Sequence, residues 1–184
     1  IIAIRFPDIS GKRIAIIATD YFEESELTFP RDKLVKAGAT VDIIAPKSGS
    51  IQGVQHVEMG KKVEVTKTLD EANPNDYDGL VVPGGALNAD HLRMEQKARD
   101  FLISILDEQE KPTAIICHGP WLLASAHLAR GRKVTSYPTI QDDLINAGAE
   151  WTDEQVVQDG SLITSRNPGD LPAFTDAFMT ALSK

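Results

Sequence analysis

The segment 113–126, TAIICHGPWLLASA, contains the only cysteine of the chain, Cys117. The apolar residues 114–116 predict a short buried strand, and the good helix formers after Pro120 predict a helix. A thiol at such a sharp strand-to-helix turn lies near unpaired backbone N–H groups, which lower a thiol pKa and can hold an oxyanion. A lone cysteine is more often a small buried hydrophobic residue, but this context makes Cys117 the candidate nucleophile.

His118 directly follows the cysteine and is the candidate for proton transfer. Adjacent residues on a regular helix do not face each other, which would leave His118 uninvolved. A sharp turn departs from regular helical geometry, so a direct proton-transfer role stays equally open. If His118 acts as a base, an acidic residue should orient its second ring nitrogen, and Asp90 is the candidate for that role.

Three glutamates lie close together in the acidic stretch 20–26. Glu24 is explained by the preference for negative charge at a helix start. Glu23 and Glu26 are three residues apart and could share a face directed at the cleft. A carboxyl group beside a thiolate has a raised pKa, and its protonated form could donate a hydrogen bond to sulfur.

Gly84 and Gly85 follow the apolar run 78–82. Glycines allow close backbone approach, and their N–H groups could complete an oxyanion hole together with the N–H of His118. The alternative is a plain turn without a chemical role.

Alternating apolar runs and helical patterns organise the rest of the chain. Strands are predicted at 13–18, 41–45, 78–82, 114–116 and 133–136, and helices at 25–37, 90–109, from 121 onward, 140–147 and 170–182. A small hairpin is predicted within 46–66, and an antiparallel pair at 151–157 and 162–165. This order predicts a single α/β domain, 1–184, with a mainly parallel sheet between two helical layers.

In such a sheet the ligand site lies beyond the carboxyl ends of the strands. Residues 19–26, 83–90 and 117–120 each follow a predicted strand, so we expect them to meet at one edge. This convergence brings all of the candidate residues together.

Composition limits the possible partners. The chain has 184 residues, 42% of them hydrophobic, and a formal net charge of −8, which argues against nucleic acid or an anionic membrane as a partner. One cysteine cannot form an internal disulfide, which favours a reduced, cytoplasmic location. The other histidines have no metal-ligand spacing among themselves or with Cys117, so we expect no metal and no cofactor.

Several longer motifs match one known family: YFEESELTFPRDKLVKAG, GLVVPGG, AIICHGPWLLASA, GRKVTSYPTIQDDLINAGAEW and SRNPGDLPAF. With these the chain resembles the ThiJ/PfpI family, which includes the PfpI-type intracellular cysteine peptidases (peptidase family C56) and the protein deglycases. The resemblance implies a flavodoxin-like three-layer sandwich with a nucleophile elbow, as in class I glutamine amidotransferases. Those amidotransferases need a later catalytic histidine, and no histidine follows His127.

The resemblance also implies roles for individual residues. Cys117 is the nucleophile, Glu26 is hydrogen-bonded to its sulfur, and His118 is the base. An acidic residue comes from a neighbouring subunit; it is a glutamate in the family, and Asp90 matches its position here. Family members form homodimers or larger homo-oligomers, and we expect the same of this chain.

Three functions therefore stay open. The first is a stress-protective hydrolase in which Cys117 attacks carbonyl adducts of methylglyoxal or glyoxal, while Glu23, Glu26 or His118 moves the proton; its substrates would be small carbonyl compounds or glycated proteins. The second is a peptidase for short peptides with a triad of Cys117, His118 and Asp90. The third is a redox sensor or chaperone that uses oxidised Cys117.

Overall fold

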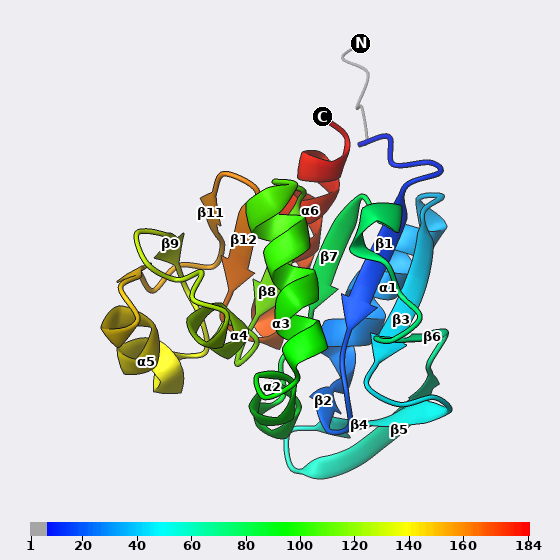
Figure 1. Cartoon of the computed structure of the whole chain (residues 1–184), viewed down its shortest axis with the longest axis horizontal. Coiled ribbons are helices and arrows are strands. Elements are labelled where there is room, and N and C mark those ends of the chain that lie inside the picture. The colour runs from blue at the N-terminus through cyan, green and yellow to red at the C-terminus, as the bar shows by residue number, and fades with distance from the viewer. Residues whose placement is uncertain (1–6) are drawn as a thin grey trace.

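A seven-stranded sheet forms the centre of the computed structural model, which describes residues 7–184 (Figure 1). The strand order is β11-β12-β8-β7-β1-β3-β6, and only β11 runs antiparallel to its neighbour. The strands are β1 (Arg13–Ile17), β3 (Thr40–Ala45), β6 (Lys67–Thr68), β7 (Gly79–Val82), β8 (Thr113–Ile116), β11 (Val157–Asp159) and β12 (Leu162–Ser165). The predicted mainly parallel sheet is confirmed.

Helices cover both faces of this sheet. One face carries α1 (Glu24–Lys36) and α6 (Leu171–Leu182), and Figure 1 shows α3 on the opposite face. That face carries α2 (Ala86–Leu92), α3 (Gln96–Leu102) with its π-helical extension η2 (Ile103–Glu108), α4 (Trp121–Ser125) and α5 (Gln141–Asn146). Short 3-10 turns lie at Pro74–Asp76, Pro138–Ile140 and Pro168–Asp170.

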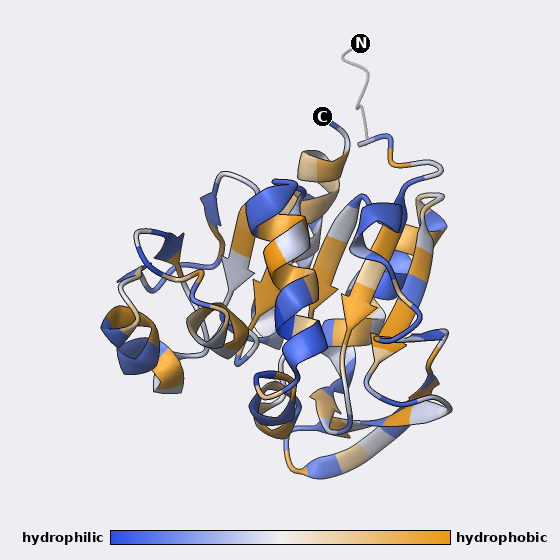
Figure 2. Cartoon of the chain, viewed as in Figure 1, coloured by the Kyte–Doolittle hydropathy of each residue, from blue (hydrophilic) through white to orange (hydrophobic). Residues whose placement is uncertain are grey.

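The two cores follow from the two-residue period of a strand. On β1, Ile14 and Ile16 pack toward α1 and α6, whereas Ala15 and Ile17 pack toward α3. The inner strands are apolar on both faces, as Figure 2 shows in orange, because helices shield both. The predicted three-layer, flavodoxin-like α/β sandwich is therefore confirmed.

Two small sheets extend this framework. The first joins β2 (Phe22–Glu23) with the hairpin β4 (Ser50–Gln55) and β5 (Glu58–Glu64), which confirms the predicted hairpin. It lies near the carboxyl ends of the central strands, at the lower edge in Figure 1. The second pairs β9 (Lys133–Val134) with β10 (Glu150–Trp151).

The prediction of one helix over 90–109 is wrong. Two helices cover this region instead. Helix α2 begins earlier, at Ala86, and ends at Leu92, and α3 begins at Gln96. Both Leu92 and Ala98 are buried, but Met94 between them is 78% exposed. The apolar stripe is interrupted there, and the break lets both helices pack their own buried residues against the sheet.

The prediction of one strand over 151–157 is also wrong. Trp151 pairs with Val134 in the small β9–β10 sheet, whereas Val157 pairs with Thr164 in the central sheet. Residues 152–155 are exposed and connect the two sheets. The strand predicted at 133–136 is correspondingly limited to β9.

None of the helices in residues 7–184 combines the length and apolar character needed to cross a membrane.

Candidate active site

Cys117 lies at a strained turn directly after β8. Its φ is +64°, a left-handed conformation that costs a non-glycine residue about 1–2 kcal/mol. Gly119 allows the turn because a Cβ there would lie 2.7 Å from Cγ2 of Ile115. Tertiary contacts hold the turn: the N–H of Cys117 donates to the carbonyl of Ser165 at 3.0 Å, and its own carbonyl accepts from the N–H of Tyr137 at 2.8 Å.

Glu26 is buried on α1 beside this sulfur. Its Oε1 accepts a hydrogen bond from the N–H of Gly84 at 2.8 Å, and its Oε2 has no hydrogen-bond partner within residues 7–184. A Cβ on Gly84 would lie 2.5 Å from both Oε1 of Glu26 and Cβ of Cys117, so these groups are in close proximity. A side chain at position 84 would therefore collide with both the cysteine and the carboxyl group, so the site requires glycine there.

The charge states of this pair are coupled. Burial, reinforced by the nearby Glu23, raises the pKa of Glu26 to about 8, although the Gly84 N–H and the Cys117 thiol act in the opposite direction. Burial and the Glu26 carboxylate raise the pKa of the Cys117 thiol. At neutral pH Glu26 is therefore mostly protonated, and Glu23 is the other nearby carboxyl group that raises the pKa of the thiol.

Backbone N–H groups also face the sulfur. Those of Gly85 and His118 lower the thiol pKa by hydrogen bonding to it. The N–H of Gly84, in contrast, is occupied by Glu26. The predicted group of oxyanion donors is corrected accordingly: Gly85 and His118 face the sulfur, whereas Gly84 holds the carboxyl.

His118 does reach the thiol. Its Nδ1 lies 3.4 Å from Sγ of Cys117, and its Nε2 lies 3.4 Å from Oγ1 of Thr139. The ring stacks on Tyr137 with centroids 4.7 Å apart and meets Trp121 edge-on. Partial burial lowers the pKa of His118, so the imidazole is neutral at pH 7 and can accept a proton.

Glu23 is buried at the edge of the same cleft. Its two carboxylate oxygens accept the backbone N–H of His56 at 3.2 and 3.1 Å, and Oε1 also lies 3.4 Å from Nδ1 of that residue. His56 occupies the turn between β4 and β5, so the hairpin holds this carboxylate in place. Glu24 points away and accepts from Gln55.

Asp90 does not join the other candidates within one chain. It is exposed on α2, its side chain makes no hydrogen bond or ion pair with residues 7–184, and it does not line the cleft. Thr139 rather than Asp90 is the intrachain neighbour of the second ring nitrogen of His118.

A cleft of about 620 Å³ opens in front of Cys117. Its wall is largely apolar, with Glu23, His56 and His118 as its titratable groups apart from the thiol and with Tyr21 and Tyr137 among the aromatic ones. Cys117 lies at the base of this cleft and is only 6% exposed. A volume of this size is typical of sites that bind small molecules.

Sequence reasoning missed Asn88, which is fully buried on α2. Its Oδ1 accepts the N–H of Thr19 at 2.7 Å, and its Nδ2 donates to the carbonyls of Pro83 and Gly84 at 3.1 and 2.9 Å. The side chain therefore joins the loops that follow β1 and β7. An asparagine in a helix that follows a Gly-Gly turn is the only signal that could have indicated it.

Sequence reasoning also missed Tyr137 and Thr139. They come from the loop after β9, and nothing in the local pattern indicates that they lie against His118.

Comparisons with known proteins cover nearly the whole chain. Residues 12–181 match the model of the DJ-1/PfpI family. The chain is 42% identical over 170 residues to "Deglycase PfpI" of Pyrococcus furiosus, covering 92% of this chain and 99% of that protein. It is 44% identical over 169 residues to "Protein/nucleic acid deglycase 2" of Escherichia coli, covering 89% and 94%.

Among solved structures, DJ-1beta of Drosophila melanogaster is similar, with a TM-score of 0.86 and 27% identity over 94% of this chain and 91% of that chain. Sequence and fold thus agree over nearly the whole length. The chain belongs to the DJ-1/PfpI family.

Proposed function

We propose that this protein is a cytoplasmic cysteine hydrolase that removes methylglyoxal or glyoxal adducts from amino groups, which is a deglycase activity. The observation that carries the proposal is the position of the Cys117 sulfur at the base of the cleft, 3.4 Å from the neutral imidazole of His118. The names of the relatives from Pyrococcus furiosus and Escherichia coli support the substrate class.

The chemistry starts with transfer of the thiol proton to Nδ1 of His118. The sulfur then attacks the carbinol carbon of the adduct, the S–C bond forms and the C–N bond breaks. The departing amine takes the proton back from His118. The Gly85 and His118 N–H groups stabilise negative charge that develops at the sulfur or an adjacent oxygen.

A hydrogen shift between the two substrate carbons then converts the sulfur-bound adduct into a thioester. Glu23, whose carboxylate lines the cleft, is the group placed to carry that proton. Water hydrolyses the thioester and returns the free thiol with a hydroxy acid as product. Protonated Glu26 stays neutral through these steps, so it does not repel the thiolate.

Purified wild type and Cys117→Ser test this proposal. We expect wild type to release free amine from the aminocarbinol of methylglyoxal with N-acetyllysine, and the variant to lose at least about 100-fold in rate. His118→Asn should lose on the order of 100-fold in kcat. Melting temperatures identify any folding defect, and unchanged turnover in folded Cys117→Ser would refute the proposal.

The second candidate is a redox sensor in which Cys117 is oxidised to a sulfinic acid. Oε2 of Glu26 favours it, because this buried carboxyl oxygen is unpartnered within residues 7–184 and lies where it could bind an oxygen added to the sulfur. Intact mass after mild peroxide distinguishes the two functions. Mass gain confined to protein with Cys117, together with no adduct turnover, would favour the sensor.

A peptidase for short peptides is the remaining alternative. Its triad would combine Cys117 and His118 with Asp90 of a second copy, since Asp90 does not line the cleft of its own chain. Release of a fluorescent amine from short peptide amides, with loss in Cys117→Ser, is the corresponding assay.

A further inference from the structure

Both polar groups of the Cys117 backbone are held by segments distant in sequence. The N–H donates to the carbonyl of Ser165 at the end of β12, and the carbonyl accepts from the N–H of Tyr137 after β9. The left-handed φ of +64° persists only if the surrounding structure enforces it. The orientation of the sulfur therefore depends on how firmly Ser165 and Tyr137 are fixed.

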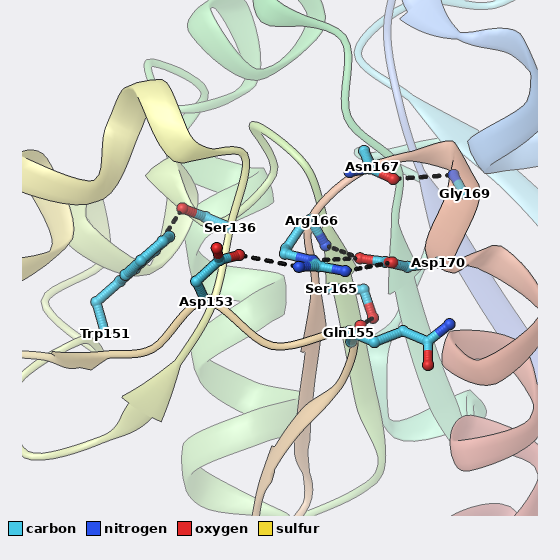
Figure 3. Close-up of polar contacts among 9 residues, drawn as sticks. All are labelled: Ser136, Trp151, Asp153, Gln155, Ser165, Arg166, Asn167, Gly169 and Asp170. Carbon is cyan, nitrogen blue, oxygen red and sulfur yellow. Dashed lines mark hydrogen bonds and ion pairs between the residues drawn. The ribbon is translucent and has the colours of Figure 1, made fainter.

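One exposed connection, the 151–155 segment, reaches both of these partners. On one side, Nε1 of Trp151 donates to Oγ of Ser136 at 2.9 Å, and that hydroxyl donates to the carbonyl of Tyr137 at 2.9 Å. On the other side, the carbonyl of Gln155 accepts from Oγ of Ser165 at 2.7 Å. Figure 3 shows the first and last of these bonds on either side of the segment.

A cluster of ion pairs around Arg166 adds to the contact between the 151–155 segment and the end of β12. Arg166 directly follows Ser165, and its guanidinium binds Asp153 of the segment at 2.9 Å and the buried Asp170 at 3.0 Å (Figure 3). Its backbone N–H also donates to Asp170 at 2.9 Å. The end of β12 is therefore fixed to the start of α6 and to the 151–155 segment.

We propose that the 151–155 segment is a positioning device for the nucleophile, in which Trp151 holds the Tyr137 side and Gln155 the Ser165 side of the Cys117 turn. Because Tyr137 also stacks on His118, the Trp151–Ser136 hydrogen bond positions both partners of the proton transfer. The inference rests on Cys117 being the reactive group of the proposed function. It assigns a positioning role to Trp151 and Gln155, which do not line the cleft.

Trp151→Phe tests the first connection, because it removes the indole N–H and keeps an aromatic ring. We expect kcat to fall about tenfold with little change in KM, since substrate contacts are retained and only the reacting geometry is loosened. The pH midpoint for alkylation of Cys117 by iodoacetamide should rise by about one unit, as the backbone N–H groups are no longer fixed on the sulfur. Alkylation reports on the thiol even if deglycation is not the activity.

Ser136→Ala and Ser165→Ala test the two sides separately and alter smaller side chains, so they apply even if Trp151→Phe fails to fold. Tyr77→Phe is the matched control: it removes an aromatic hydrogen bond of 2.6 Å to Asp42, far from the cleft. The control should lose stability and keep both kcat and the alkylation profile. If the Ser136 and Ser165 variants behave like the control, the segment is merely structural and the proposal is overturned.

Discussion

Three side chains define the chemistry at the scale of single residues, and burial shifts the pKa of each of them. Burial raises the pKa of Glu26 to about 8 and lowers that of His118. At neutral pH both groups are mostly uncharged. In water a free glutamate would be ionised at this pH, whereas a free cysteine and a free histidine would be mostly neutral, so burial changes the charge of Glu26 alone. Burial also raises the pKa of the Cys117 thiol and lowers that of His118; both shifts oppose proton transfer in the resting site, so the thiolate that forms depends on the Gly85 and His118 N–H groups for its stabilisation.

Glu26 makes the stability of the fold depend on pH. Its folded pKa of about 8 exceeds the ordinary value of 4.5, so the folded state retains a proton that the unfolded chain releases. The associated stability is fully present below pH 4.5 and is lost as the pH rises to about 8, by up to about 1.4 kcal/mol for each pH unit.

Glu26→Gln removes this titration and keeps an acceptor for the Gly84 N–H. We expect the melting temperature of the variant, relative to wild type, to increase from pH 5 to pH 8. Glu150→Gln, at an exposed carboxylate on β10, should show a constant difference. A constant difference for Glu26→Gln as well would show that the carboxyl is ionised throughout this range.

The packing around Cys117 and Glu26 leaves no room for a side chain at Gly84. A methyl group there would lie 2.5 Å from Cβ of Cys117 and 3.0 Å from its sulfur. We expect Gly84→Ala to destabilise the protein by more than about 2 kcal/mol and to reduce the alkylation rate of the thiol. Thermal unfolding and iodoacetamide kinetics measure the two effects.

Gly11→Ala is the control for this change. Its methyl group would enter open space, so only the left-handed φ of +76° costs about 1–2 kcal/mol. The thiol of this variant should react as in wild type. Equal thiol reactivity in both alanine variants would contradict the close packing around Gly84.

At the scale of elements, the cleft is made where strand ends meet a hairpin. The loops after β7 and β8 supply Gly85 and Cys117, strand β2 supplies Glu23, and the β4–β5 turn adds His56 and Val57 to the wall. Val57 lies at the tip of that turn, lines the cleft and is 94% exposed. The tip of the hairpin thus forms part of the cleft wall, whereas Ile51 and Val63 on its strands are buried in the core.

Val57→Asn should therefore raise KM severalfold and leave kcat nearly unchanged, because an apolar contact with substrate is lost and the sulfur is untouched. Its stability should stay within about 0.5 kcal/mol of wild type. Val35→Asn on α1, also exposed but outside the cleft, is the control and should keep both constants. A fall in kcat alone for Val57→Asn would argue against a binding role of the hairpin.

At the scale of the whole molecule, the second ring nitrogen of His118 has no acidic partner within residues 7–184 of its own chain. Thr139 is its neighbour, and Asp90 is exposed away from the cleft. Our proposal that Asp90 acts from a neighbouring copy in a homo-oligomer accounts for both observations. Leu87 on α2 and Met94 just after α2 are both exposed, and they offer apolar surface near Asp90 for contact with a second copy.

Asp90→Asn tests this arrangement. We expect about a tenfold loss of kcat, with the melting temperature unchanged, and Asp100→Asn on α3 should keep full activity as an equally exposed control. The Cys117→Ser and Asp90→Asn proteins can also be mixed, dissociated and reassembled. The mixed oligomer should be more active than either variant alone, because the intact Cys117 of one copy then meets the intact Asp90 of the other. Sedimentation must show an oligomer, and a fully active Asp90→Asn would exclude the shared site.

The sequence by itself determined the sheet, the helix layers and the position of the nucleophile. The short, β-branched apolar runs in β1, β7 and β8 favour buried strands, and the Cys-His-Gly-Pro sequence after β8 favours a sharp turn. Because parallel strands end at one edge, Glu23, Glu26 and Cys117 had to converge. Local patterns were sufficient here because each depends on a few consecutive residues.

Only the tertiary structure decided which groups actually meet. The break between α2 and α3 and the division of 151–157 between two sheets depend on packing against distant strands. The N–H of Gly84 is taken by Glu26, and Tyr137, Thr139 and Trp151 reach the site from loops without any local signal. Contacts between residues far apart in sequence, and the burial that shifts their pKa values, arise only when the chain is folded.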